Sequence, residues 1–126
     1  MQRYLGVLIA AGGALLAAQV SAHHSFSGTY FENRRVTIEG ELAQLLFRNP
    51  HSIVHVIVKD EAGRDVRYAV EWAAAGELEG QGVTSRTLKI GDRVVITGNP
   101  ARNARDHRVR MMTLHRPKDN FSYNGN

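Results

Sequence analysis

The 126-residue chain contains no cysteine. Without cysteine there can be no disulfide bond, and a lipoprotein-type anchor attached through an N-terminal cysteine is also excluded. Stability must therefore come from a hydrophobic core, or from a bound ligand or metal ion. A domain of about 100 residues is large enough for such a core, because folding buries more than about 60% of the surface of its unfolded chain.

Familiar catalytic motifs are missing as well. The sequence has no Ser-His-Asp order, no Gly-rich phosphate loop and no HExxH pattern. Glu39, Glu41 and Glu71 are the carboxylates nearest the expected strands, but Glu39 and Glu41 alternate with apolar neighbours, as on the outer face of a strand. We therefore expect a protein that acts by binding and not as an enzyme, with a copper-dependent activity as the one enzymatic possibility left open.

No apolar run reaches the length of about 20 residues that a stable transmembrane helix needs. The run from Leu5 to Ala18 follows Arg3, and Val20 and Ala22 then occupy the −3 and −1 positions of a signal-peptidase cut. This pattern is typical of a secretory signal peptide. We predict export to the periplasm and cleavage after Ala22, with no stable membrane insertion afterwards. A retained membrane anchor is the alternative.

The remainder of the chain alternates apolar and polar residues over short segments, as β-strands do. Strands are predicted over residues 36–47, 52–58, 66–72, 93–98 and 108–114, with a short helix over 73–82. Gly40, inside the first strand, predicts a bulge or a sharp bend. A long bent strand, a hairpin, a helix and two further strands predict an all-β fold, a small five-stranded OB-like barrel. An open β-sandwich is the alternative.

Four parts of the chain are expected. They are a signal peptide (1–22), an N-terminal arm (23–35), an OB-like barrel domain (36–116) and a flexible C-terminal tail (117–126). The arm is predicted to be extended, with the aromatic rings of Phe26, Tyr30 and Phe31 packed on the barrel. Trp72, the only tryptophan, is expected in the core.

Four short segments together resemble a known family. They are His23-His24-Ser25-Phe26, Asn49-Pro50-His51-Ser52, Val70-Glu71-Trp72, and Leu88-Lys89-Ile90-Gly91-Asp92-Arg93-Val94 with Gly98. In order and spacing they are similar to the exported bacterial family called domain of unknown function 6152. The departures are local, at Phe47-Arg48 and in the loop over residues 73–83. The resemblance implies export and a small β-barrel, and it implies no activity.

Histidines provide the main functional hypothesis, which is a copper site. If cleavage follows Ala22, His23 offers its free α-amine and its ring Nδ1 to one metal ion. One further imidazole, from His51 or His24, would complete an all-nitrogen site of the type called a histidine brace, and such ligands with tetragonal geometry favour Cu(II). The alternative for these three histidines is an ordinary structural or solvent-exposed role. His55, His107 and His115 are expected to lie outside the site.

A second hypothesis, from another class, is an adaptor that binds an envelope protein or a polyanion through the barrel face and an arginine-rich loop. Its candidate residues are Arg102, Arg105, Arg108 and Arg110. Nucleic acid is not an expected partner, because no aromatic residue for base stacking occurs between Trp72 and Phe121. A solvated arginine loop, or a structural protein without a ligand, are the remaining alternatives, and the oligomeric state is left open.

Overall fold

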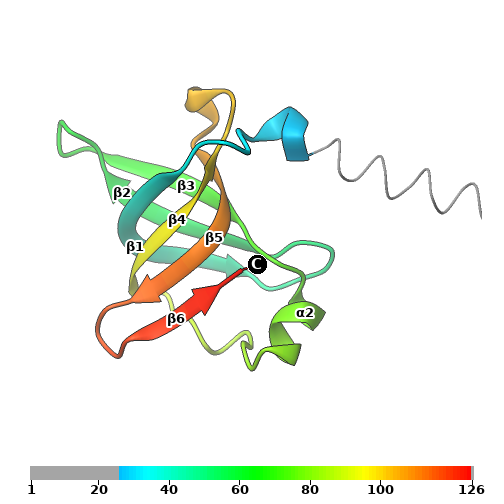
Figure 1. The fold of residues 1–126 in the computed structure, drawn as a ribbon. Helices are drawn as coiled ribbons and strands as arrows, with labels where there is room; N and C mark the ends of the chain where they lie inside the picture. Colours follow the sequence, from blue (N-terminus) through cyan, green and yellow to red (C-terminus); the bar gives the residue numbers. More distant parts are fainter. Residues whose placement is uncertain (1–25, 126) are drawn as a thin grey trace, which may run out of the picture.

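The computed structural model describes residues 26–125. Six strands, one α-helix and one 3₁₀ helix follow a helical turn at residues 26–29 (Figure 1). Their order is β1 (Val36–Leu46), β2 (Ile53–Lys59), β3 (Asp65–Glu71), α2 (Ala75–Gly80), β4 (Arg93–Pro100), η1 (Ala104–Asp106), β5 (Arg108–Arg116) and β6 (Phe121–Asn124). No helix among the described residues is both long and apolar enough to cross a membrane.

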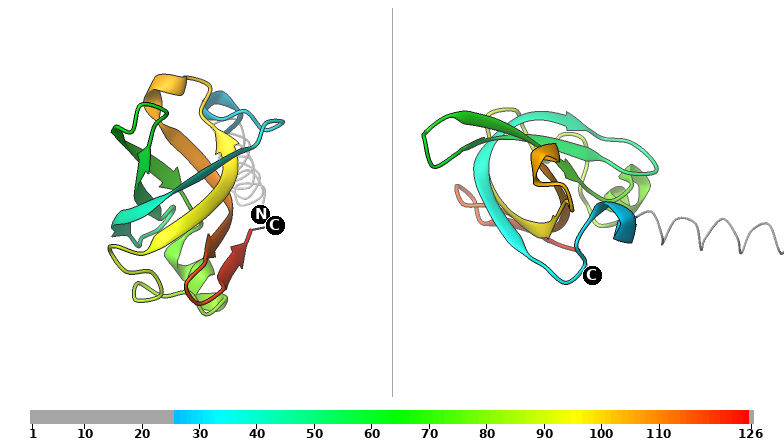
Figure 2. Two further views of the ribbon diagram at one scale, coloured as in Figure 1. Left: turned by 90° about the vertical axis from the view of Figure 1, so that its left-hand side faces the viewer. Right: turned by 90° about the horizontal axis from the view of Figure 1, so that it is seen from above.

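Five of these strands close into a barrel. The first half of β1 pairs with β4 and its second half pairs with β2, so that one long strand joins two parts of the sheet. A short parallel pairing of β3 with β5 then closes the sheet on itself. Seen from above, the strands curve around a centre and η1 lies over one end (Figure 2). The predicted small five-stranded barrel, with its helix between the third and fourth strands, is confirmed.

Alternation along the strands fills the barrel. In β1, β2 and β4, every second side chain is buried over much of the strand, as the pleat requires. The core also takes in Leu78 from α2 and Trp72 just after β3, whose indole lies edge-on to the ring of Tyr123. The prediction that Trp72 is a core residue is therefore confirmed.

Two expectations about local structure need correction. The register of β1 shifts between Leu42 and Gln44, so the bulge does not lie at Gly40, where instead a Cβ atom would meet the Ile57 carbonyl oxygen of β2. The tail after residue 116 is not a loose segment throughout, because β6 pairs with β5 and Tyr123 is buried. Only four residues of the tail, Phe121–Asn124, alternate aromatic and polar side chains, and this short strand pairs with the edge of β5 and packs Tyr123 on Trp72.

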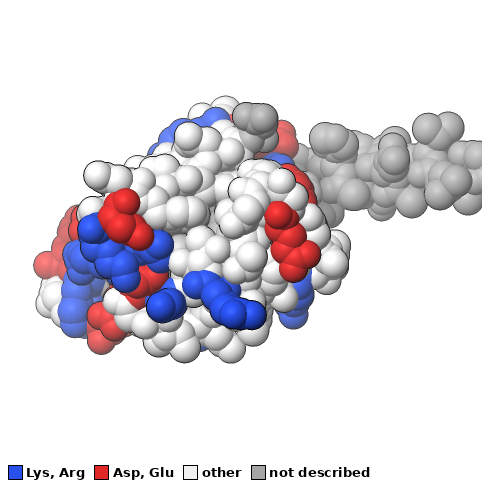
Figure 3. Space-filling model, turned by 90° about the horizontal axis from the view of Figure 1, so that it is seen from below, with Lys and Arg blue, Asp and Glu red and all other residues white. Residues whose placement is uncertain are grey.

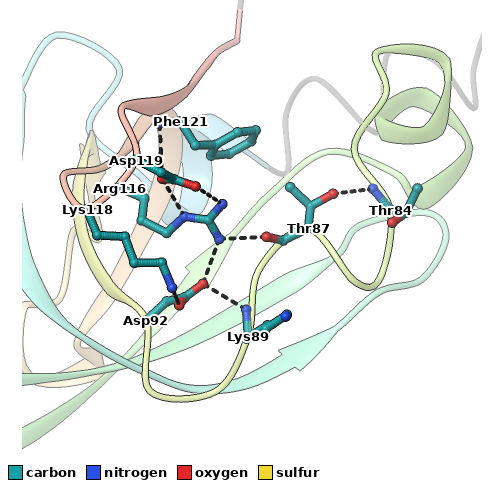
Figure 4. Close-up of polar contacts among 8 residues, drawn as sticks. All are labelled: Thr84, Thr87, Lys89, Asp92, Arg116, Lys118, Asp119 and Phe121. Atoms are coloured by element: carbon teal, nitrogen blue, oxygen red, sulfur yellow. Dashed lines mark hydrogen bonds and ion pairs between the residues drawn. The ribbon is translucent and has the colours of Figure 1, made fainter.

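Charged side chains of both signs lie close together at the end of the molecule that is seen from below (Figure 3). At this end an ion network around the buried pair Asp92–Arg116 joins the loop before β4 to the turn after β5 (Figure 4). Arg116 donates to Asp92 Oδ2 at 2.7 Å, to the Thr87 carbonyl at 2.7 Å and to both oxygens of Asp119. Lys118 and the backbone N–H of Lys89 also donate to Asp92, whose side chain is only 4% exposed.

This network predicts a loss of stability in acid. Burial alone would raise the pKa of Asp92, but the hydrogen bonds from Lys118, the Lys89 N–H and Arg116 outweigh it and lower the pKa to about 2. Because the pKa is lower in the folded protein than the unfolded value of about 3.9, the stabilisation is complete above about pH 4 and is lost as the pH falls towards 2. Urea unfolding should be measured for the wild type and for Asp92→Asn at pH 6, 4 and 2.5. The difference between their free energies of unfolding should become smaller as the pH falls. A difference that stays constant over this range would contradict the prediction.

Candidate functional site

His51 stands in the loop between β1 and β2, and this loop is held in place by backbone and short side chains. Ser52 is fully buried, and its hydroxyl accepts a hydrogen bond from the backbone N–H of Arg48 at 3.2 Å. The side-chain oxygen of Asn49 accepts a hydrogen bond from the N–H of Gly76, at the start of α2, at 3.2 Å. These two hydrogen bonds hold the loop that carries His51, whose side chain is 41% exposed. The Asn49–Pro50 peptide bond in this loop is cis.

The N-terminal arm docks directly on His51. The ring of Phe26 lies edge-on to the imidazole, with 5.3 Å between the ring centroids, and the guanidinium of Arg110 lies 4.1 Å from the centroid of the Phe26 ring. Residues 26–29 form a helical turn and are not extended, which corrects the predicted shape of the arm. The predicted packing is confirmed fully for Tyr30, which is 1% exposed. Phe26 and Phe31 are only partly buried, and Phe31 lies under the guanidinium of Arg102.

Further contacts fix the arm along the β4–β5 connection. Tyr30 forms an isolated antiparallel bridge with Ala101, and the guanidinium of Arg102 donates to the Ser27 carbonyl at 2.6 Å. The side-chain amide of Asn99 donates to three backbone carbonyls of the arm, those of Phe31, Glu32 and Arg34. The described part of the arm, residues 26–35, is therefore part of the folded domain.

Glu71, the last residue of β3, lies between the arm and His51. Its Oε2 accepts a hydrogen bond of 2.6 Å from the hydroxyl of Tyr30 and forms an ion pair with Arg108 at 3.5 Å. Its Oε1 lies 3.9 Å from Nδ1 of His51. Burial of Tyr30, together with its hydrogen bond to Glu71, raises the pKa of the phenol, so that Tyr30 stays a hydrogen-bond donor at all physiological pH values.

A pocket of ≈ 400 Å³ opens beside these residues. Its wall includes residues of the helical turn at 26–29, the β1–β2 loop, the end of β3, α2, β5 and β6. The helical turn, the β1–β2 loop and α2 lie on the same side of the barrel (Figure 1). The side chains in this wall that can bind a ligand through a charge, a ring nitrogen or a sulfur atom include those of His51, Glu71, Glu77, Arg110 and Met112. The volume is within the range of about 300–1,000 Å³ that is usual for sites of small ligands.

The three predicted metal ligands are only partly covered by the structure. His51 lines the pocket, whereas His23 and His24 lie outside the described residues. Within residues 26–125, no three histidine, aspartate or glutamate side chains converge in a way that could hold a metal ion. A site at His51 with three ligands of these residue types would therefore need at least one ligand from outside residues 26–125.

The four predicted arginines do not form one free basic surface. Arg102 binds the arm, Arg108 pairs with Glu71 and Arg110 covers Phe26, while the side chain of Arg105 is exposed on η1. The polyanion hypothesis stays a prediction that no contact in the described part of the chain favours.

Tyr30 is the site residue that sequence reasoning did not single out, although its packing was expected. Its partner Glu71 lies 41 positions away along the chain, and no local pattern connects an arm residue with the end of a strand. Two features of the sequence pointed to Glu71, its place in a family-like segment and its position near an expected strand.

Comparison with known proteins gives one match. No curated protein and no solved structure matches the chain. Residues 13–110 match the model of a protein family that is described as "Family of unknown function (DUF6152)". The matched range includes His23, His24, His51 and Glu71. Because the match covers more than half of the chain, the protein belongs to this family.

Proposed function

We propose that this protein is an exported periplasmic metal-binding or accessory protein, which holds copper with the mature N-terminal His23, with His51 and with His24. The observation that carries the proposal is the packing of Phe26 on His51. Phe26 lies only three residues after His23, and a chain advances at most about 3.6 Å per residue. A terminus created by cleavage after Ala22 would then lie within about 11 Å of Phe26, and so within reach of His51.

The contacts of the arm support the same proposal. Arg110, Arg102 and Asn99 all hold residues of the arm in place, although a segment of this length could have stayed free in solvent. Pinning Phe26 reduces the entropy that the terminus loses when it closes on a metal ion, because the ligands are already confined to a small volume. An α-amine and imidazole nitrogens are ligands that suit Cu(II) in a tetragonal arrangement.

The α-amine of His23 is tested by adding one alanine before it, with every side chain left intact. We expect the affinity for Cu(II) to fall at least about 100-fold, since even the loss of a group that only supports a ligand costs 10–100-fold. Calorimetric titration gives the affinity, and the EPR spectrum of the Cu(II) protein should lose one of its nitrogen couplings. Unchanged affinity and spectrum would remove the terminal amine from the site.

His51 is tested with a matched pair of histidine variants. His51→Asn should weaken Cu(II) binding, whereas His107→Asn, on the loop beside Tyr68, should leave it unchanged. His107 has a positive φ of 46°, which asparagine tolerates, so the control variant is expected to fold. Intact mass of the exported protein completes the test, because a leader that is retained or cut at another bond contradicts the proposed chelate.

A further inference from the structure

The carboxylate of Glu71 lies beside the imidazole ring of His51, a proposed copper ligand. A histidine that binds a metal through one ring nitrogen usually donates its other ring N–H to a carboxylate or carbonyl, which fixes its tautomer and orientation. Glu71 Oε1 lies 3.9 Å from Nδ1 of His51, which is longer than a hydrogen bond, and the two groups would have to approach by about 1 Å for the ring N–H to donate. Nδ1 is the ring nitrogen of His51 that this carboxylate faces.

Glu71 is itself held from the opposite side. Both of its other contacts, the hydroxyl of Tyr30 and the guanidinium of Arg108, go to Oε2, which leaves Oε1 turned to His51. The carboxylate is only 14% exposed, so the three partners compete little with solvent for it. Tyr30 belongs to the arm, and therefore the docking of the arm also fixes the group that faces His51.

We infer that Glu71 is a positioning residue, which keeps the proton of the neutral His51 ring on Nδ1 and leaves Nε2 free to bind the metal ion. The role of His51 as a metal ligand rests on the proposed copper site. The arrangement of Glu71, Tyr30 and Arg108 around His51 does not depend on that proposal. Tyr30 and Arg108 act through Glu71, by fixing which of its oxygens faces His51.

The substitution Glu71→Gln should replace the hydrogen-bond acceptor that faces His51 by a hydrogen-bond donor. In Glu71→Gln, the donors Tyr30 and Arg108 retain the amide oxygen on their side, so that the amide NH₂ group turns towards Nδ1 of His51. Nδ1 must then accept a hydrogen bond, and the ring proton moves to Nε2. This variant keeps the size and shape of the side chain, so that a changed tautomer reports the proton and not a loss of packing.

The experiment reads the tautomer in metal-free protein labelled with ¹⁵N-histidine, at a pH where His51 is neutral, by long-range ¹H–¹⁵N correlation spectra. We expect the Nδ1–H form in the wild type and the Nε2–H form in Glu71→Gln. Asp65→Asn, an acid-to-amide change at the other end of β3, is the control and should keep the Nδ1–H form. Cu(II) affinity should fall about 10–100-fold in Glu71→Gln and stay unchanged in Asp65→Asn.

The outcomes separate the two proposals. An Nε2–H form in the wild type overturns the inference without any variant, even if Glu71→Gln fails to fold. A folded Glu71→Gln protein that keeps the Nδ1–H form overturns it as well. If the tautomers change as expected while His51→Asn binds Cu(II) as tightly as the wild type, the positioning role of Glu71 stands and the role of His51 in the copper site is wrong.

Discussion

Replacement of Asp92 by alanine should lower the free energy of unfolding by about 3 kcal/mol, since removing one partner of a buried ion pair costs about 3–5 kcal/mol. Asp92 and Arg116 are 4% and 10% exposed, so neither charge can be solvated well once its partner is gone. The lower end of the range applies because Arg116 keeps its two hydrogen bonds to Asp119 (Figure 4). Urea unfolding followed by circular dichroism at pH 7 measures the change.

Asp65→Ala is the matched control for Asp92→Ala. Asp65 pairs with Lys59, and these two side chains are 61% and 69% exposed, so the loss of the pair should cost less than about 1 kcal/mol. Equal costs for the two variants would mean that the network at Asp92 does not stabilise the barrel. The comparison thus tests burial, because the same residue type is removed in both variants.

Replacement of Gly40 by alanine should be about as costly, at roughly 3 kcal/mol, because overpacking a closely packed interior costs 1–3 kcal/mol and occasionally more. A Cβ atom at this position would lie 2.1 Å from the Ile57 carbonyl oxygen and 2.8 Å from Cγ1 of Val56. The nearest atom belongs to the backbone of β2, so a change of rotamer cannot relieve the contact. Denaturant unfolding of the variant measures the cost.

Gly80→Ala is the control for Gly40→Ala. No atom lies within 4 Å of the position that its Cβ would take, and Gly80 ends α2, where alanine is the better helix former. We expect this variant to be as stable as the wild type or slightly more stable. If Gly40→Ala unfolds at the same urea concentration as Gly80→Ala, then β1 and β2 do not approach each other as closely as described.

The site joins two parts of the molecule that the sequence keeps apart. Phe26 and Tyr30 come from the arm, whereas His51 and Glu71 come from the ends of a hairpin, and each arm residue contacts one of these two. The docking of one short segment therefore places Phe26 on His51 and Tyr30 on Glu71. Variants of Arg110 or Asn99 would be expected to act on the proposed metal site through the arm, without contact with the metal ion.

His23, His24 and His51 stay predicted ligands, chosen from the sequence for their residue type and position. The surroundings of His51 could not be predicted in the same way. The partner of Tyr30 is 41 residues away, and the roles of Arg102 and Arg110 as holders of the arm oppose the expectation of a free basic loop. A charged side chain looks the same in a sequence whether it faces solvent or an aromatic ring.

The alternation of apolar residues, the turn residues and the spacing of the strands determined by themselves that this chain forms a small five-stranded barrel with one short helix. Successive side chains of a strand point to opposite faces, so a strand with one buried face needs an apolar residue at every second position. This pattern can be read directly from the sequence. Only the tertiary structure decided that Phe121–Asn124 forms a sixth strand, that Gly40 meets the backbone of β2 and that Tyr30 holds Glu71 beside His51. These contacts join residues far apart in the chain, and their energies depend on distances that exist only after the barrel has closed.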